Sequence, residues 1–309
     1  MNRTKRMSSR WSRWVVGVSA ALVLAVAAEA APLRVVATTG MVGDLATQIA
    51  GDHADVEYLM GPGVDPHLYK ATASDVRKLQ RADVILYNGL FLEGKMQSIL
   101  ERMAKGGRHV AAITARLDHN RLLDPGDGSG HPDPHVWFDI LLWAQCVPVV
   151  VETLSKAAPD SAAYFQQQGE RVTAELLALH AWAQELSAHL PAAKRILVTS
   201  HDAYGYFGEA YGFQVVGLQG ISTVSEAALA DMASLVDFIK SRGVKAIFVE
   251  SSVPHATIER IATDAKVAIG GELFSDAMGT PGQMENGYDL GTYDGMVRHN
   301  LTTIVEALR

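Results

Sequence analysis

Short apolar runs that alternate with amphipathic segments are the feature that most constrains the fold of this chain. Four such runs lie in its first half and four in its second. Runs of this kind, with helical patterns between them, indicate βα units built around parallel sheets. They cover residues 33–38, 56–60, 84–87 and 109–113, then 195–199, 214–218, 245–249 and 267–269. The chain is therefore predicted to be an α/β protein with two lobes.

A long helical pattern separates the two sets of runs. Its apolar positions recur at spacings of three, four and seven, and they are Phe165, Val172, Leu176, Leu179, Trp182, Leu186 and Leu190. Pro159 marks its start and Pro191 its end. About 30 helical residues would span roughly 45 Å, which suits a rigid connector between lobes. We expect a signal peptide at 1–31, an N-terminal lobe at 32–158, a connecting helix at 159–191 and a C-terminal lobe at 192–309.

The N-terminus has the pattern of an export signal. A basic region, with Arg3 and Lys5 among its residues, precedes an apolar run and the small residues Ala28 and Ala30. This order is typical of a secretory signal peptide that is cut near Ala30 or Ala31. A retained membrane anchor is the alternative, but the apolar run is shorter than the roughly 20 residues that a spanning helix needs. With no cysteine at the cleavage site, we expect a soluble periplasmic protein that is not lipid-anchored.

Charge and cysteine content exclude further classes. The formal net charge is −7, and no basic stripe remains once the leader is removed, so nucleic acid is not an expected partner. The single cysteine, Cys146, cannot form an internal disulfide, and its apolar surroundings predict a buried, inert thiol. We expect a monomer.

Three histidines in separate loops are the candidate functional residues. His67, His135 and His201 each follow a strand-like run, and Asp276 lies in a similar loop after the last run. Because ligands of open α/β sheets bind beyond the carboxyl ends of the strands, two facing lobes would bring these side chains into one cleft. Three neutral imidazoles and a carboxylate complete the first coordination shell of a divalent transition metal without a thiolate.

His131 competes with His135 for this role, since a single loop histidine is more often a surface or hydrogen-bonding residue than a ligand. We favour His135 because the apolar residues that follow it would seat its ring against a wall. Asp139 is the expected acceptor for the second ring N–H of His135, because metal-bound imidazoles commonly donate to such a group.

The segments around these residues resemble a known family. The strings at 131–139, 200–207, 247–255 and 270–279 are closely similar to those of the zinc/manganese (TroA-like) solute-binding proteins of bacterial ABC importers. The likeness extends along the mature chain. It implies two (β/α)4 lobes joined by one long backbone helix, and a metal between the lobes. It also implies delivery of that metal to a membrane permease driven by a cytoplasmic ATPase.

The family's four liganding positions match His67, His135, His201 and Asp276. The choice of metal stays open. The stretch before His135 lacks the histidine- and acid-rich loop of zinc-dedicated members, whereas manganese-dedicated members often carry Glu where this chain has His201. Such a ligand set suits Zn²⁺, and it admits Mn²⁺ or Fe²⁺ if the carboxylate binds through both oxygens.

A metalloenzyme, such as an exported zinc hydrolase, is the main alternative function. Catalytic zinc keeps one position open for water, whereas four protein ligands would close the shell. Glu250 is the best available base, but a glutamate at a strand end is expected to hold ligand loops by hydrogen bonds. A third possible function is that of an adhesin with a structural metal, but an adhesin would have no use for a cleft between two lobes. We therefore predict that the protein is not an enzyme.

Overall fold

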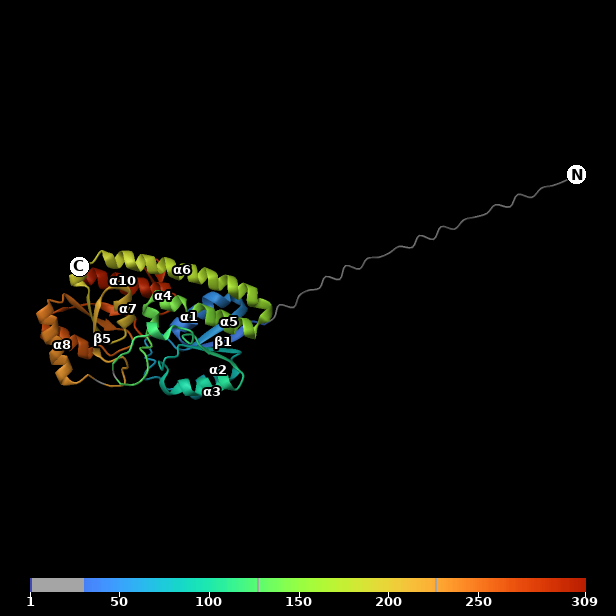
Figure 1. The fold of residues 1–309 in the computed structure, drawn as a ribbon, viewed down its shortest axis with the longest axis horizontal. Coiled ribbons are helices and arrows are strands. Elements are labelled where there is room, and N and C mark those ends of the chain that lie inside the picture. The colour runs from blue at the N-terminus through green and yellow to red at the C-terminus, as the bar shows by residue number, and fades with distance from the viewer. Residues whose placement is uncertain (2–30, 127, 226) are drawn as a thin grey trace. The chain divides into compact units, whose positions relative to one another are not determined.

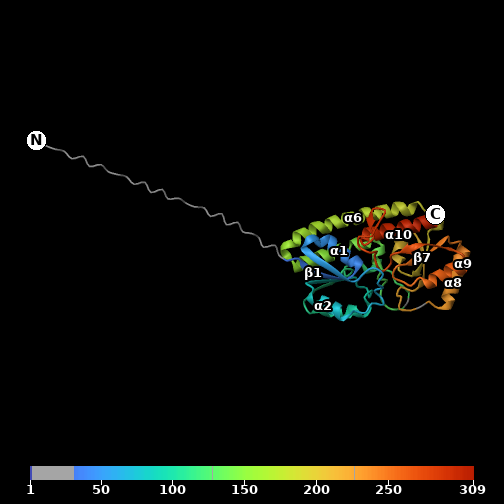
Figure 2. The same cartoon turned by 180° about the vertical axis from the view of Figure 1, so that it is seen from behind.

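The computed structural model of this chain describes residues 1, 31–126, 128–225 and 227–309. Residues Pro32–Arg309 form one compact unit. The predicted signal peptide falls almost wholly on residues 2–30, which lie outside the described residues. Every helix and strand of the described residues belongs to the unit Pro32–Arg309 (Figures 1 and 2).

The N-terminal lobe is built on a four-stranded parallel sheet in the order β2-β1-β3-β4. Its elements are β1 (Leu33–Thr39), α1 (Gly40–Ala50), β2 (Ala54–Met60), α2 (Ala73–Arg81), β3 (Val84–Tyr87), α3 (Gln97–Lys105) and β4 (His109–Ala112). All four residues of β3 are buried, as expected for a central strand that is covered on both faces. Because the strands are parallel, their carboxyl ends lie at one edge of the sheet.

The C-terminal lobe repeats this plan with a less regular sheet. Its strands are β5 (Ile196–His201), β6 (Gln214–Gln219), β7 (Ala246–Glu250) and β8 (Ala268–Leu273), and its helices are α7 (Gly205–Tyr211), α8 (Leu229–Arg242), α9 (Ala256–Ala265) and α10 (Tyr293–Leu308). The strands form two hydrogen-bonded parallel pairs, β5–β6 and β7–β8, with β5 beside β7. A small antiparallel hairpin, β9 (Met284–Glu285) and β10 (Tyr288–Asp289), precedes α10.

One helix, α6 (Ala162–Ala188), connects the lobes and runs along both of them (Figure 1). It packs on α1, α4 (Ile140–Ala144) and α5 (Val147–Ala157) on the N-terminal side, and on α7 and α10 on the C-terminal side. It is shorter than the predicted span of 159–191, because a 3₁₀ turn, Pro159–Ser161, precedes it and it ends at Ala188. Its 27 residues still extend about 40 Å. The predicted fold class is confirmed.

A single apolar core passes from one lobe to the other. It joins Met41 and Trp143 to Phe165 of α6, and then to Phe248 and Ile304 of the C-terminal lobe. An interface of this apolar kind limits movement between lobes, because opening it would expose the core to water. Cys146 belongs to this core, and burial raises the pKa of its thiol, in agreement with an inert cysteine.

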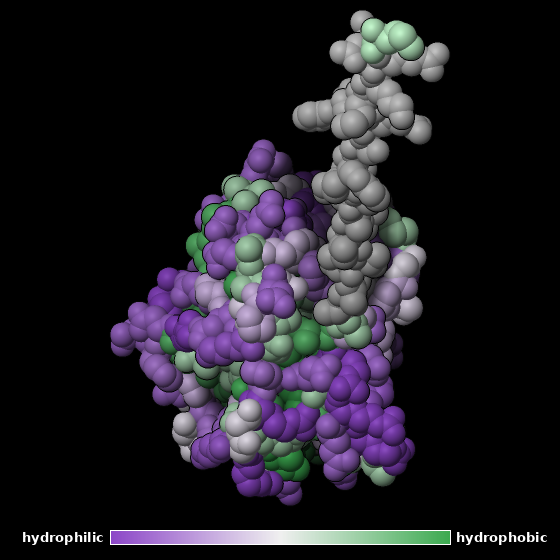
Figure 3. All heavy atoms as spheres, turned by 90° about the vertical axis from the view of Figure 1, so that its right-hand side faces the viewer, coloured by the Kyte–Doolittle hydropathy of each residue, from purple (hydrophilic) through white to green (hydrophobic). Residues whose placement is uncertain are grey.

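Among the described residues, one helical stretch, Ile140–Ala157, is long and apolar enough to cross a membrane. Most of it is buried inside the protein, where it supplies core residues such as Leu142 and Val150. The face in Figure 3 is mostly hydrophilic, with smaller apolar areas between the polar side chains. The apolar stretch is therefore accounted for by the core.

Candidate metal centre

The four predicted ligand residues converge between the lobes. His67 lies in the loop after β2, and His135 follows β4 directly before the 3₁₀ turn Val136–Phe138. His201 is the last residue of β5, so the strand runs further than its predicted end at residue 199, and Asp276 follows β8. One ligand atom from each lies within 4.8 Å of all the others.

The spacing of these atoms fits a small cation. His135 Nε2 lies 3.2 Å from Asp276 Oδ1 and 3.3 Å from His67 Nε2. Asp276 Oδ2 lies 3.4 Å from His201 Nε2 and 3.5 Å from His67 Nε2. Four ligands placed tetrahedrally at about 2.0–2.1 Å from Zn²⁺ would lie about 3.3–3.4 Å apart. The side chains thus surround a point at which a metal ion would reach all four.

Several of these atoms lack any other partner. His201 Nε2 and both carboxylate oxygens of Asp276 are buried and make no hydrogen bond. Burying unpaired polar atoms costs free energy, and burying an unpaired charge costs more. Burial raises the pKa of Asp276, but His201 and His135 outweigh it and hold that pKa well below its usual range. An ionised carboxylate facing imidazole nitrogens is the donor set that a divalent cation requires.

Carboxylates fix the orientation of two of the imidazoles. Asp133 Oδ1 accepts from the backbone N–H of His135 at 2.9 Å and lies 2.7 Å from its Nδ1. Glu250 does the same for His201, with Oε1 2.9 Å from the backbone nitrogen and Oε2 2.5 Å from Nδ1. Once the ring is neutral, these partners assign its remaining proton to Nδ1 and leave Nε2 to bind a metal.

Asp133 takes the role that was predicted for Asp139, and that prediction is wrong. Asp139 Oδ1 instead caps α4 by accepting from Leu141 N at 2.9 Å, and its other oxygen pairs with Arg121 at 3.2 Å. An Asp two residues before a His can bond the His backbone N–H in an Asx turn. The repeated Asp-Pro-His tripeptide was therefore a signal for Asp133 in the sequence. Glu250 does hold a ligand loop by hydrogen bonds, as predicted.

His67 has different surroundings. Its backbone N–H donates to Asp65 Oδ1 at 2.8 Å, and its side chain is 5% exposed, whereas those of His135, His201 and Asp276 are 0% exposed. Burial lowers its pKa to about 4, despite the opposing charge of Asp276. His67 is therefore neutral at physiological pH and able to coordinate.

The loop that carries Asp276 is tied to both lobes. Trp137 Nε1 donates to Ser275 O at 3.1 Å, from the N-terminal lobe. Asn300 of α10 brackets Phe274, accepting from its N–H at 2.9 Å and donating to its carbonyl at 2.7 Å. The carboxylate is consequently held in place from both sides of the cleft.

His131 stays outside the cluster, so the structure brings together His135 and not its neighbour. The His131 ring stacks on Phe91, with ring centroids 4.2 Å apart and planes 6° from parallel. Both rings line a pocket of about 190 Å³ whose wall includes His67. This pocket reaches the cluster from the side of its least buried ligand.

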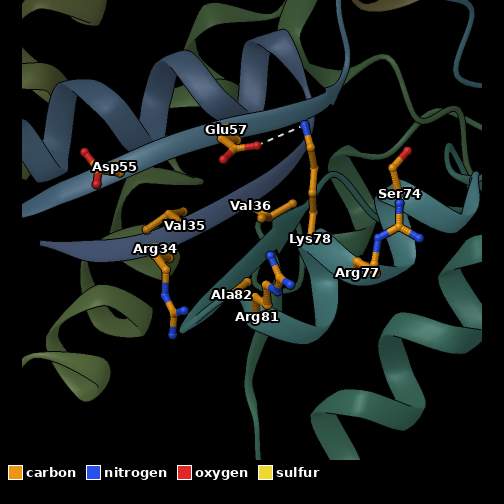
Figure 4. A pocket seen from close by; sticks show the side chains of 10 residues that line it. All are labelled: Arg34, Val35, Val36, Asp55, Glu57, Ser74, Arg77, Lys78, Arg81 and Ala82. Carbon is orange, nitrogen blue, oxygen red and sulfur yellow. Dashed lines mark ion pairs between the residues drawn. The ribbon is translucent and has the colours of Figure 1, made fainter.

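A second hollow, of about 570 Å³, lies against β1, β2 and α2 and shares no lining residue with the cluster (Figure 4). Two of its basic side chains, Lys78 and Arg34, form exposed ion pairs. Lys78 Nζ lies 2.9 Å from Glu57, and Arg34 lies 2.8 Å from Asp83. These exposed pairs form no convergent set of ligands.

The fold and the cluster together define a class, the two-lobed solute-binding proteins that hold a metal ion between their lobes. The family described as "Zinc-uptake complex component A periplasmic" matches residues 35–307. The chain belongs to this family. Its members are solute-binding transport proteins, so the prediction that the protein is not an enzyme is confirmed.

Individual relatives agree with this assignment. The chain is 46% identical over 282 residues to the manganese-binding lipoprotein MntA of Bacillus subtilis, covering 90% of each chain. It is 48% identical over 287 residues to the zinc-binding protein TroA of Treponema pallidum, covering 91% of this chain and 90% of the relative. The solved structure of the T. pallidum periplasmic zinc-binding protein TroA superposes with a TM-score of 0.84 over 90% of this chain and 99% of that one.

These relatives also correct the predicted localisation. MntA of B. subtilis and PsaA of Streptococcus mitis, the latter 28% identical over 287 residues, are both named lipoproteins. The prediction of a protein without a lipid anchor is therefore wrong. It depended on the absence of a cysteine near Ala30, and the names of these relatives overturn it.

Proposed function

We propose that this protein captures a divalent transition-metal ion, Zn²⁺ or Mn²⁺, with His67, His135, His201 and Asp276, and hands it to the membrane permease of an ABC importer. This proposal is supported by the convergence of four buried donor groups. Three of their atoms, His201 Nε2 and both carboxylate oxygens of Asp276, make no hydrogen bond. The family supports the transport role, because its members serve metal ABC importers.

The carboxylate determines which metals fit. Asp276 Oδ1 faces His135, whereas Oδ2 faces His67 and His201, so both oxygens point toward the centre. Zn²⁺ would bind one oxygen and three nitrogens, and Mn²⁺ or Fe²⁺ would use both oxygens to gain coordination number. Relatives named for manganese and for zinc match at 46% and 48% identity, so similarity favours neither metal.

The geometry of this site supports hydrolysis less well than metal transport. Four protein ligands would fill a tetrahedral shell and leave no position for an activated water. Glu250, the candidate general base, is fully buried and engaged with the backbone nitrogen and the ring Nδ1 of His201. A carboxylate occupied in this way positions a ligand and has no access to a substrate.

The remaining organisation follows from the same role. Residues 1–31 would direct export to the periplasm, followed by lobes at 32–158 and 192–309 and a connecting helix at 159–191. The compact unit of the described residues begins at Pro32, which supports the first division. The protein would work as a monomer, since one chain supplies all four ligands. Its formal net charge of −7 gives no reason to expect nucleic acid as a partner.

Calorimetric titration of chelator-stripped protein with Zn²⁺ and with Mn²⁺ tests the proposal. We expect one ion per chain. At about 1,000 times the dissociation constant, the ion should stabilise the fold by roughly 4 kcal/mol in thermal unfolding. His135→Ala should abolish tight binding, and the matched control His131→Ala, in the same segment, should bind like the parent. Equal losses in the two variants, or the absence of one-to-one binding in the parent, would contradict the proposal.

A further inference from the structure

The loop that carries His67 is joined to the C-terminal lobe by a hydrogen bond that spans the cleft. Asp65 Oδ1 accepts from His67 N at 2.8 Å, and its second oxygen accepts from Thr223 Oγ1 at 2.5 Å. Asp65 belongs to the loop after β2, and Thr223 lies between β6 and α8. A single carboxylate thus links a candidate metal ligand to the opposite lobe.

Thr223 is well placed to hold its own segment. It is 9% exposed, although Val224 beside it is 65% exposed. Residues 220–225 contain no helix or strand. A buried hydroxyl that bonds an ionised carboxylate makes a stronger contact than a neutral pair does. The bond to Asp65 therefore fixes a short irregular segment against the N-terminal lobe.

That segment is one wall of the pocket leading to the metal centre. Ile221, Ser222 and Val224 line the pocket from the C-terminal lobe, and His67 contributes to the same lining. His67 is the least buried of the four candidate ligands, at 5% side-chain exposure. A cation that exchanges with solvent would thus enter and leave past His67, alongside this wall.

We infer that the Thr223–Asp65 hydrogen bond latches the wall formed by residues 221–224 and sets the rate at which the metal ion enters and leaves past His67. Asp65 and Thr223 are positioning residues that do not touch the ion. This inference rests on the proposed function. Breaking the latch should free the wall in both directions, so capture and release accelerate together while the dissociation constant changes little.

The test is the rate at which metal-loaded full-length mature protein releases Zn²⁺ or Mn²⁺ to excess chelator, measured by stopped flow. Thr223→Val should release the ion about ten-fold faster, the effect of losing one hydrogen bond of about 1.4 kcal/mol. Thr223→Ser keeps the hydroxyl and should behave like the parent. Thr153→Val is the matched control, because Thr153 is 8% exposed and its hydroxyl bonds only Val149 O within α5.

A double-mutant cycle identifies the bond. Asp65→Asn keeps an acceptor for His67 N and exchanges the charged acceptor of the Thr223 hydroxyl for an amide N–H, which makes a weaker, neutral contact, so it should speed release by less than Thr223→Val does. Thr223→Val should add less in that background than it does in the parent, because both changes act on one contact. If Thr223→Val does not fold, the release rate of Asp65→Asn still tests the proposal. Parental release rates in these variants, or a Thr223→Ser protein as fast as Thr223→Val, would overturn the latch. A parent that binds no metal would instead overturn the proposed function.

Discussion

Two Asp-Pro-His tripeptides in the N-terminal lobe have the same sequence and different contacts. In residues 133–135, Asp133 accepts from both the backbone nitrogen and the ring Nδ1 of His135, at 2.9 Å and 2.7 Å. In residues 65–67, Asp65 contacts His67 through the backbone nitrogen alone and gives its second oxygen to Thr223. Asp133 therefore orients the ring of its neighbouring histidine, whereas Asp65 forms a hydrogen bond with the opposite lobe.

This difference separates a fixed ligand from an exchangeable one. His135 is fully buried beside Trp137, whereas the His67 side chain borders a pocket. The apolar core shared by the lobes opposes large hinge movements. Exchange of the ion is then expected at the His67 side, by a local movement, while the other ligands keep their places.

The largest expected effect separates the two histidines themselves. His135→Ala should weaken Zn²⁺ binding roughly 500-fold, since an apparent 10–16 kcal/mol shared by four ligands leaves roughly 2.5–4 kcal/mol for each. His67→Ala should cost about 100-fold, because water from the pocket can take the vacant position on Zn²⁺. Competition titrations with a chelator of known affinity measure both values. Equal losses would remove the distinction between fixed and exchangeable ligands.

The two histidines should also differ in the protons they give up. Burial lowers the pKa of His135, but Asp133 and Asp276 outweigh burial and raise it to about 9. The pKa of His201 is likewise raised well above its usual value, because Glu250 and Asp276 outweigh its burial. The pKa of His67 is instead lowered to about 4. At neutral pH the rings of His135 and His201 are therefore in the charged imidazolium form, and a metal must displace one proton from each. The ring of His67 is already neutral.

Binding near pH 7.5 should accordingly release about two protons per ion, and affinity should rise about 100-fold per pH unit. The sign follows from the raised pKa values, since protonated imidazole cannot coordinate. The rise should become less steep as the pH passes about 9, because His135 then has no extra proton to release. Calorimetry in buffers of different ionisation enthalpy counts the protons. Zero proton release at pH 7.5 would show that the carboxylates do not hold His135 and His201 in the charged form.

The smallest effect compares the two aspartates. Asp133→Asn should weaken metal binding 10- to 100-fold, the range typical of removing a carboxylate behind a metal-bound histidine. Asp65→Asn should change affinity by less than about three-fold, because an amide oxygen can still accept from the His67 backbone. Equilibrium titration of the two variants side by side decides the matter. A larger loss in Asp65→Asn would mean that Asp65 supports the ring of His67 as well as its backbone.

Much of the fold could be predicted because local patterns report burial directly. The run at 84–87 has the bounds of β3, since a central strand is apolar at every position. The end of β5 was placed too early, because Ser200 and His201 are polar residues buried by their tertiary contacts. The C-terminal sheet also shifts register between Ile247 and Phe248, opposite Gly271 with its φ of 147°. Such a shift in register cannot be inferred from the pattern of hydrophobic residues.

The sequence by itself determined the two-lobed α/β fold, the connecting helix and the four candidate ligands, because each depends on residue type and on position relative to a strand end. Only the tertiary structure decided which carboxylate forms a hydrogen bond with the ring of each histidine. Asp139 was expected behind His135, yet it caps α4, and Asp133 takes that place. The two Asp-Pro-His segments show the physical reason. A short side chain bonds whichever donor the fold brings within about 3 Å, and identical tripeptides are given different neighbours by elements distant in sequence.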